Sequence, residues 1–241
     1  MTTRRQVLAG SLTLLAAAQT PAAKLNIVCT GGHPDDPESG CGGTLARFSG
    51  SGHKVTILYL TRGERGIQGK SLDEAASIRT AEAQAACRIL GAKPVFAGQI
   101  DGATELNQER VAAFSKLLAA ESPDIVFTQW PIDSHMDHQV ASILTLRAWY
   151  GMQRRFRLYF YEVNAGAQTM GFHPTDYIDI TSVRDKKKAA LFAHKSQDGE
   201  EIYRKHHEVM ENFRGREARM SAAEGFVHLA AAGSALDNRF G

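Results

Sequence analysis

The sequence predicts an α/β domain built on a mostly parallel β-sheet with helices on both faces. Short, β-rich apolar runs alternate with segments whose apolar residues recur at helical spacing, as in successive βα units. Polar loops follow the first, second and fourth of these runs. Parallel sheets bind ligands at the carboxyl ends of their strands, so we expect the functional site at that edge of the sheet.

Composition is compatible with one globular domain and excludes some partners. The chain has 241 residues, of which 43% are hydrophobic, enough to bury a full-sized core. Its formal net charge is only +2, so there is no electrostatic case for binding nucleic acid. The three cysteines, Cys29, Cys41 and Cys87, are widely spaced and form no C-x-x-C pair. We therefore expect neither a thiolate zinc site nor a disulfide framework.

Residues 1–23 have the pattern of an export signal. Arg4 and Arg5 precede an apolar stretch at 7–18 and small residues at 19–23. The adjacent arginines favour the twin-arginine route over an ordinary secretory signal, which is the alternative. We expect a mature single domain at 24–241 that is periplasmic or secreted, with no stable membrane anchor.

The first half of the mature chain gives three strands and two helices. The runs LNIVCT and KVTILYL are apolar and β-rich, as buried strands are. A longer segment with helical spacing ends at Gly91, a residue suited to a helix C-cap. The expected elements are, in order, strand 25–30, helix 43–49, strand 54–60, helix 72–90 and strand 94–97.

The second half continues the alternation. The run DIVFT and the run RLYFYEV are the clearest strands by the same test. We expect the basic run 186–188 to be a solvated helix face, and the pair at 206–207 to lie on the surface. The expected elements are helix 109–120, strand 124–128, helix 135–149, strands 157–163 and 177–180, and helices 183–193 and 200–214.

The first chemical cluster, His33-Pro34-Asp35-Asp36, directly follows the first strand. Pro34 fixes its own φ and restricts His33. The loop can therefore aim an imidazole and the carboxylate of Asp36 at a common point, which leaves Asp35 to face something else.

The second cluster, Asp133-Ser134-His135-Met136-Asp137-His138, directly follows the fourth strand. His135 and His138 are three residues apart, so they share a face at the start of a helix. With the first cluster they offer two histidines, one carboxylate and an open position, as in catalytic zinc sites. Ferrous oxygenases use the same ligand types, so the set alone does not name the metal.

The residues that carry the chemistry resemble the PIG-L/LmbE-like N-acetylglucosaminyl deacetylase family. The most specific segments are the run 33–44, HPDDPESGCGGT, and His135-x-Asp137-His138. Weaker agreement lies at 61–64 (TRGE), 79–82 (RTAE), 101–102 (DG) and 194–197 (HKSQ). The resemblance spans nearly the whole mature chain and implies a Rossmann-like fold. Gly32 and Pro37 depart from the pattern that many relatives show.

The resemblance implies a Zn²⁺ ion and hydrolysis of an N-acetyl group on an amino sugar, a small-molecule partner. By this resemblance, His33, Asp36 and His138 are the zinc ligands. Asp35 corresponds to the general base that takes a proton from the attacking water.

Four further roles follow from the same resemblance. His135 would stabilise the oxyanion or protonate the leaving amine. Asp137 would orient His135 and favour its charged form. Arg62 and Asp101 correspond to positions that contact the sugar.

Three rival interpretations compete with this hypothesis. A ferrous enzyme with two histidines and one carboxylate would use the same ligands. A non-catalytic sugar-binding module would be expected to lose Asp35 or a ligand, and the chain keeps them all. A nucleotide-binding domain is disfavoured because the chain has neither a G-x-G-x-x-G motif nor a P-loop lysine.

Overall fold

A computed structural model describes residues 23–165 and 167–230 of the chain. The strands are β1 (Asn26–Gly31), β2 (Lys54–Tyr59), β3 (Lys93–Phe96), β4 (Ile125–Gln129), β5 (Arg157–Tyr161), β6 (Asp176–Asp179) and β7 (Ala223–His228). The helices are α1 (Asp36–Gly50), α2 (Leu72–Leu90), α3 (Gln108–Ala120), α4 (Met136–Gly151), α5 (Arg184–Phe192), α6 (Gly199–Ile202) and α7 (Glu208–Ala218). Single 3₁₀ turns lie at Thr181–Val183 and Lys195–Gln197, and a π-helical turn at Tyr203–His207 joins α6 to α7.

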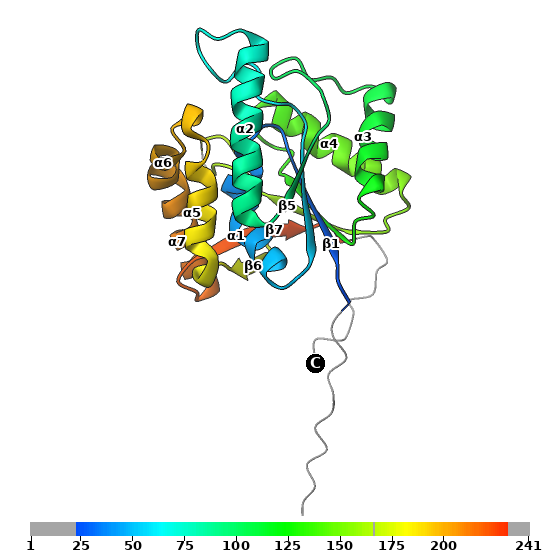
Figure 1. Ribbon diagram of the computed structural model, residues 1–241. Helices are drawn as coiled ribbons and strands as arrows, with labels where there is room; N and C mark the ends of the chain where they lie inside the picture. The colour runs from blue at the N-terminus through cyan, green and yellow to red at the C-terminus, as the bar shows by residue number, and fades with distance from the viewer. Residues whose placement is uncertain (1–22, 166, 231–241) are drawn as a thin grey trace, which may run out of the picture.

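The seven strands form one sheet in the order β3-β2-β1-β4-β5-β7-β6. The first five are parallel, whereas β7 pairs antiparallel with both β5 and β6. Helices α3 and α4 cover one face, and α1, α2, α5, α6 and α7 cover the other (Figure 1). The predicted α/β class, with a mostly parallel sheet covered on both faces, is confirmed.

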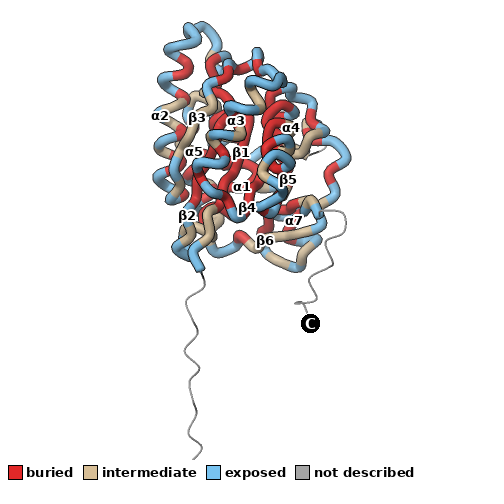
Figure 2. Tube along the Cα trace, turned by 90° about the vertical axis from the view of Figure 1, so that its right-hand side faces the viewer, coloured by how far each residue is buried: buried red, intermediate tan, exposed pale blue. Residues whose placement is uncertain are grey.

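Each face of the sheet has its own apolar core. One core packs strand residues such as Ile57 against Leu45 and Leu90, and the other packs Leu58 against Phe114 and Leu144. Figure 2 shows the buried strands enclosed between layers whose outer surfaces are exposed. Successive residues of β2 therefore serve opposite cores, which explains its continuous apolar sequence.

The chain reverses the direction in which it adds strands beside β1. It proceeds outward from β1 through β2 to β3, then returns to place β4 on the other side of β1. The loops that leave the carboxyl ends of β1 and β4 therefore run in opposite directions and leave a crevice between them. Both chemical clusters lie in these two loops.

Helix α1 begins seven residues earlier than the sequence predicted, at Asp36 rather than at residue 43. Glycine weakens helix propensity, and Gly40, Gly42 and Gly43 concealed the first turns. These glycines allow close packing. A Cβ at Gly40 would clash with Cδ2 of Tyr161 at 2.3 Å, and one at Gly43 would clash with Cγ2 of Ile180 at 2.6 Å. The helix can therefore approach the sheet closely.

Strand β7 was not predicted. Its sequence, AEGFVH, has one strongly apolar pair and an interior glycine, so it gives a weak strand signal. Its place between β5 and β6 supplies partners on both sides. Tertiary pairing therefore decides its conformation.

The expected export signal, residues 1–23, lies almost wholly outside the described residues, so it stays a prediction. Among the described residues, no helix combines the length and hydropathy needed to cross a bilayer.

Candidate metal centre and active site

The loop after β1 is held in place from both sides. The Gly32 N–H donates to Oε1 of Gln129 at 2.8 Å, and the Tyr161 hydroxyl donates to the Thr30 carbonyl at 2.9 Å. Residues of β4 and β5 thus fix the end of β1 against their own ends. A Cβ at Gly32 would lie only 3.0 Å from Cδ2 of His138, so the glycine lets the second cluster approach the first.

Two of the three predicted ligands, the imidazoles of His33 and His138, contact the same carboxylate oxygen of the third, Asp36. Oδ2 of Asp36 lies 3.1 Å from Nδ1 of His33 and 3.2 Å from Nε2 of His138. All three side chains are buried. Donor atoms bound tetrahedrally to zinc lie roughly 3.4 Å from one another, so the distance from Asp36 to each imidazole is compatible with a cation held by that pair.

Two other groupings of donors overlap this set, and in these two groupings, unlike the set with Asp36, all donor atoms lie close to one another. The ring nitrogens of His33, His135 and His138 lie within 4.8 Å of one another, as do single donors from His33, Asp101, His135 and Asp137. We favour the set with Asp36, because that carboxylate is buried and contacts both rings, whereas His135 is exposed.

Each ligand imidazole is oriented by a carboxylate on its other nitrogen. Nε2 of His33 lies 3.0 Å from Oδ2 of Asp137, and Nδ1 of His138 lies 3.2 Å from Oδ1 of Asp133. Metal-binding histidines almost always donate their other N–H to such a partner. Asp133 was missed as a functional residue, although its position directly after β4 was a usable signal.

The electrostatics of the cluster favour a bound cation. Burial works against charged imidazoles, yet the Asp36 carboxylate raises the pKa of His33 well above its usual value and that of His138 to about 9. The carboxylates thus draw extra positive charge into a buried site. A divalent ion would supply that charge in place of two protons, so the donor set fits a metal.

Asp35 lies beside the metal-binding residues in a strained backbone conformation. It is the N-cap of α1 with φ of 106°, a region that residues with a Cβ rarely occupy. Its N–H donates to Oε2 of Glu38 at 3.2 Å, and Nη2 of Arg79 donates to its Oδ2 at 3.1 Å. Burial raises the pKa of Asp35 to about 6 although Arg79 opposes the shift. A pKa near neutrality suits a general base.

A buried network supports this strained turn. Oε1 of Glu38 accepts a hydrogen bond from the Tyr59 hydroxyl at 2.6 Å and contacts Nε2 of His194 at 3.1 Å. Arg79 also donates to the Pro34 carbonyl at 2.5 Å. The network therefore holds the peptide group between Pro34 and Asp35 at both its carbonyl oxygen and its N–H.

The structure corrects the expected role of Asp137. We expected its carboxylate to orient His135, but it contacts His33 and accepts from the Gly102 N–H at 2.8 Å and the Thr104 hydroxyl at 2.6 Å. The first turn of α4 directs this side chain toward the loop after β3, where those donors lie.

His135 is the N-cap of α4 and lines the cavity. Its Nδ1 accepts the N–H of Asp137 at 3.2 Å. Although His135 is exposed, partial desolvation of its ring, together with the neighbouring His33 and His138, lowers its pKa below the usual value. The charged imidazole that we expected is therefore disfavoured in this arrangement.

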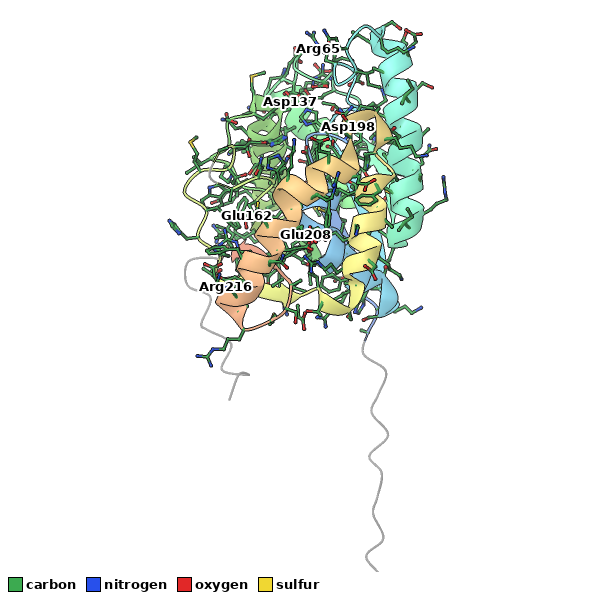
Figure 3. The ribbon with its side chains drawn as sticks, turned by 90° about the vertical axis from the view of Figure 1, so that its left-hand side faces the viewer. Arg65, Asp137, Glu162, Asp198, Glu208 and Arg216 are labelled. Carbon is green, nitrogen blue, oxygen red and sulfur yellow. The ribbon has the colours of Figure 1, made fainter. Side chains whose placement is uncertain are left out.

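The two predicted sugar-contacting residues differ in position. Asp101 lines the cavity, where Oδ1 lies 3.2 Å from Nε2 of His33. Arg62 instead pairs with Glu64 at 3.0 Å and does not line the cavity. Arg65, from the same loop, does line it; in Figure 3, Arg65 and Asp137 lie at the same end of the molecule, far from Arg216.

Two other surface expectations are wrong in part: Lys186 and His206 are exposed, but Lys187 and His207 are buried. Lys187 is only 2% exposed and pairs with Glu224 at 2.8 Å and with Glu211 at 3.4 Å. His207 is only 4% exposed and lines the cavity together with His206. Both residues belong to elements that pack against α1, Lys187 to α5 and His207 to the π-helical turn.

A cavity of about 590 Å³ adjoins the candidate metal ligands. Its lining includes His33, Asp36 and His138 together with Asp35, Arg79 and His135. Polar groups in an open pocket of this size can bind a small, hydroxyl-rich molecule.

Comparison with known proteins agrees with this geometry. The family model described as PIG-L, GlcNAc-PI de-N-acetylase, matches residues 28–149. The diacetylchitobiose deacetylase of Thermococcus kodakarensis is 31% identical over 195 residues, which cover 73% of this chain and 72% of the relative.

Solved structures share the whole architecture. The N,N'-diacetylchitobiose deacetylase from Pyrococcus horikoshii superposes with a TM-score of 0.74 at 26% identity, over 84% of this chain and 83% of its own. The protein TT1542 from Thermus thermophilus gives 0.72 at 31% identity, over 88% and 99%. The hydratase GalB from Pseudomonas putida gives 0.77 at 22% identity, over 87% and 98%, which shows the fold alone.

The GalB match shows that this fold does not by itself fix the reaction. The family assignment rests instead on the match through both chemical clusters and on the relative that aligns along most of the chain. On these grounds the chain belongs to the PIG-L/LmbE-like deacetylase family.

Proposed function

We propose that the protein is a zinc-dependent hydrolase that removes the N-acetyl group from an N-acetylglucosamine-type sugar or conjugate. The observation that carries the proposal is the shared contact of two buried imidazoles with one oxygen of Asp36, with Asp35 beside them. Relatives named as deacetylases of diacetylchitobiose and of a myo-inositol glucosaminide support the substrate class.

In this proposal His33, Asp36 and His138 hold the ion. Once bound, a zinc ion would polarise the acetyl carbonyl and lower the pKa of a water molecule toward ~7. Asp35 takes the proton of the attacking water. Its pKa of about 6 lets it act as a base in neutral solution and return the proton as an acid.

His135 is placed to stabilise the oxyanion as a neutral donor. Because its Nδ1 accepts the N–H of Asp137, its proton resides on Nε2. A hydrogen bond from Nε2 to the developing oxyanion would lower the barrier without a charged imidazole. The leaving nitrogen then receives its proton from Asp35.

Acetate release is the direct test. Metal-loaded protein is incubated with N-acetylglucosamine, N,N'-diacetylchitobiose and an inositol-linked N-acetylglucosamine, and acetate is quantified. Asp35→Asn should retain the metal yet lose activity by about 10²–10⁴-fold, whereas His138→Ala should lose the metal. Wild-type turnover by Asp35→Asn would refute the assignment of the base.

Metal analysis separates the rival interpretations. Protein purified without added metal should contain zinc, and removal by a chelator should abolish acetate release until zinc is restored. Iron with oxygen consumption would support the ferrous enzyme instead. Sugar binding without acetate release by metal-loaded protein would support the non-catalytic module.

We also propose export through the twin-arginine route, on the basis of Arg4, Arg5 and the apolar stretch that follows. Fusion of residues 1–23 to a reporter that is exported only when folded tests this proposal. Replacement of both arginines by lysine should retain the reporter inside the cell, and unchanged export would refute the route.

A further inference from the structure

The cavity has two walls that come from different parts of the chain. The wall with the metal-binding residues lies within 28–149, the range matched by the family model. The lining residues that come after that range, here called the second wall, are Val163, Asn164, Gln168, Gln197, Ile202, His206 and His207. Groups that distinguish one amino sugar from another would therefore meet the second wall.

A π-helical turn, Tyr203–His207, forms part of this second wall. It interrupts what would otherwise be one helix from α6 to α7. Single π-helical turns inside helices are rare and occur frequently at functional sites. Here two consecutive residues, His206 and His207, both line the cavity, although an unbroken α-helix turns successive side chains about 100° apart.

His207 is buried but lacks a protein partner for its ring. It is 4% exposed, and no described residue forms a hydrogen bond with its ring nitrogens. Burial and the nearby Lys187 hold its pKa at about 3, so the imidazole is neutral. In the described part of the chain, the fully buried polar atoms without a partner do not include the ring nitrogens of His207. Because His207 lines the cavity, a ligand group there can form a hydrogen bond with its ring.

We propose that His207 is a specificity-determining residue that exchanges a hydrogen bond with a hydroxyl group of the bound saccharide. A neutral imidazole has one donor and one acceptor nitrogen. A hydroxyl group can accept a hydrogen bond from the first or donate one to the second. The inference rests on the proposed function for its ligand class, an amino sugar, but not on the catalytic step. Asp198, labelled in Figure 3, marks the start of the segment α6–α7 that presents this residue.

Three variants test the inference with N,N'-diacetylchitobiose as the probe. His207→Phe keeps an aromatic ring but removes both hydrogen-bonding groups, and His207→Gln keeps a donor and an acceptor. The exposed His173→Gln is the control. His207→Phe should raise KM about three- to tenfold, the loss of one hydrogen bond, with kcat changed less than about twofold. His207→Gln should recover part of the loss.

Binding is measured separately by calorimetry with zinc-loaded Asp35→Asn as the background. The dissociation constant should rise in the same proportion when His207→Phe is added. Equal KM and equal affinity for His207→Phe and the control would overturn the inference. If the wild-type protein releases no acetate, the proposed function fails, and the calorimetric comparison still decides the role of His207; absence of binding in every variant counts against it.

Discussion

The buried imidazole of His207 should weaken the folded protein in acid. Its pKa is about 3 in the fold, against 6.5 as the ordinary value, because burial and Lys187 oppose its charge. The unfolded chain therefore binds a proton at a higher pH than the folded chain does. Stability is complete above about pH 6.5 and is lost as the pH falls toward 3.

The magnitude follows from the two pKa values. At pH 5 the unfolded histidine is mostly protonated and the folded one is not, which costs ~2 kcal/mol of unfolding free energy relative to pH 8. His207→Gln removes this contribution. The wild type should thus lose ~2 kcal/mol more than the variant between pH 8 and pH 5.

Urea unfolding of metal-free protein measures this difference, since chelation removes the effect of metal release. Every other titrating group contributes alike to the wild type and to His207→Gln, so the difference between them isolates one residue. His173→Gln, at an exposed position, is the control. Equal acid sensitivity of the wild type and His207→Gln would show that the imidazole is not held uncharged in the fold.

Three further predictions concern stability. At Asp35, where φ is 106°, glycine relieves backbone strain that alanine keeps, so Asp35→Gly should be ~1–3 kcal/mol more stable than Asp35→Ala in urea unfolding; equal stability would mean that the turn is unstrained. In α1, Gly40→Ala places a Cβ 2.5 Å from the Glu162 carbonyl oxygen, whereas Gly50→Ala meets nothing within 4 Å. Gly40→Ala should lower stability by at least ~1–3 kcal/mol and Gly50→Ala should not, so similar melting temperatures would contradict the close approach of α1 to the sheet. Lys187→Met leaves the buried Glu224 without its cation, whereas Glu211 keeps Arg184; the change should cost ~3–5 kcal/mol, and a loss below 1 kcal/mol in the same assay would show that water reaches the Glu224 carboxylate.

The sequence predicted the fold class because each local pattern was consistent with the same α/β architecture. Alternating apolar strands and periodic helices define βα units without any long-range contact, and β2 and α2 lie within a residue of their expected positions. The prediction failed for segments whose sequence signal is weak and whose conformation is decided by tertiary packing. Glycines hid the first turns of α1, and β7 depends on its neighbours β5 and β6 for its conformation.

The candidate site divides in the same way. The clusters at 33–36 and 133–138 were visible because each is contiguous in the chain and follows a strand. The partner of Asp137 and the inward position of His207 were not visible, because both depend on how distant segments meet over the sheet.

The sequence by itself determined the α/β alternation and the two segments that carry the candidate metal ligands. Those properties are encoded over a few neighbouring residues, by periodicity and by the chemistry of side chains. Only the tertiary structure decided which carboxylate orients which imidazole and which side chains form the second wall of the cavity. Such choices depend on the crossover between β1 and β4 and on close packing around it, where contacts join residues about a hundred positions apart.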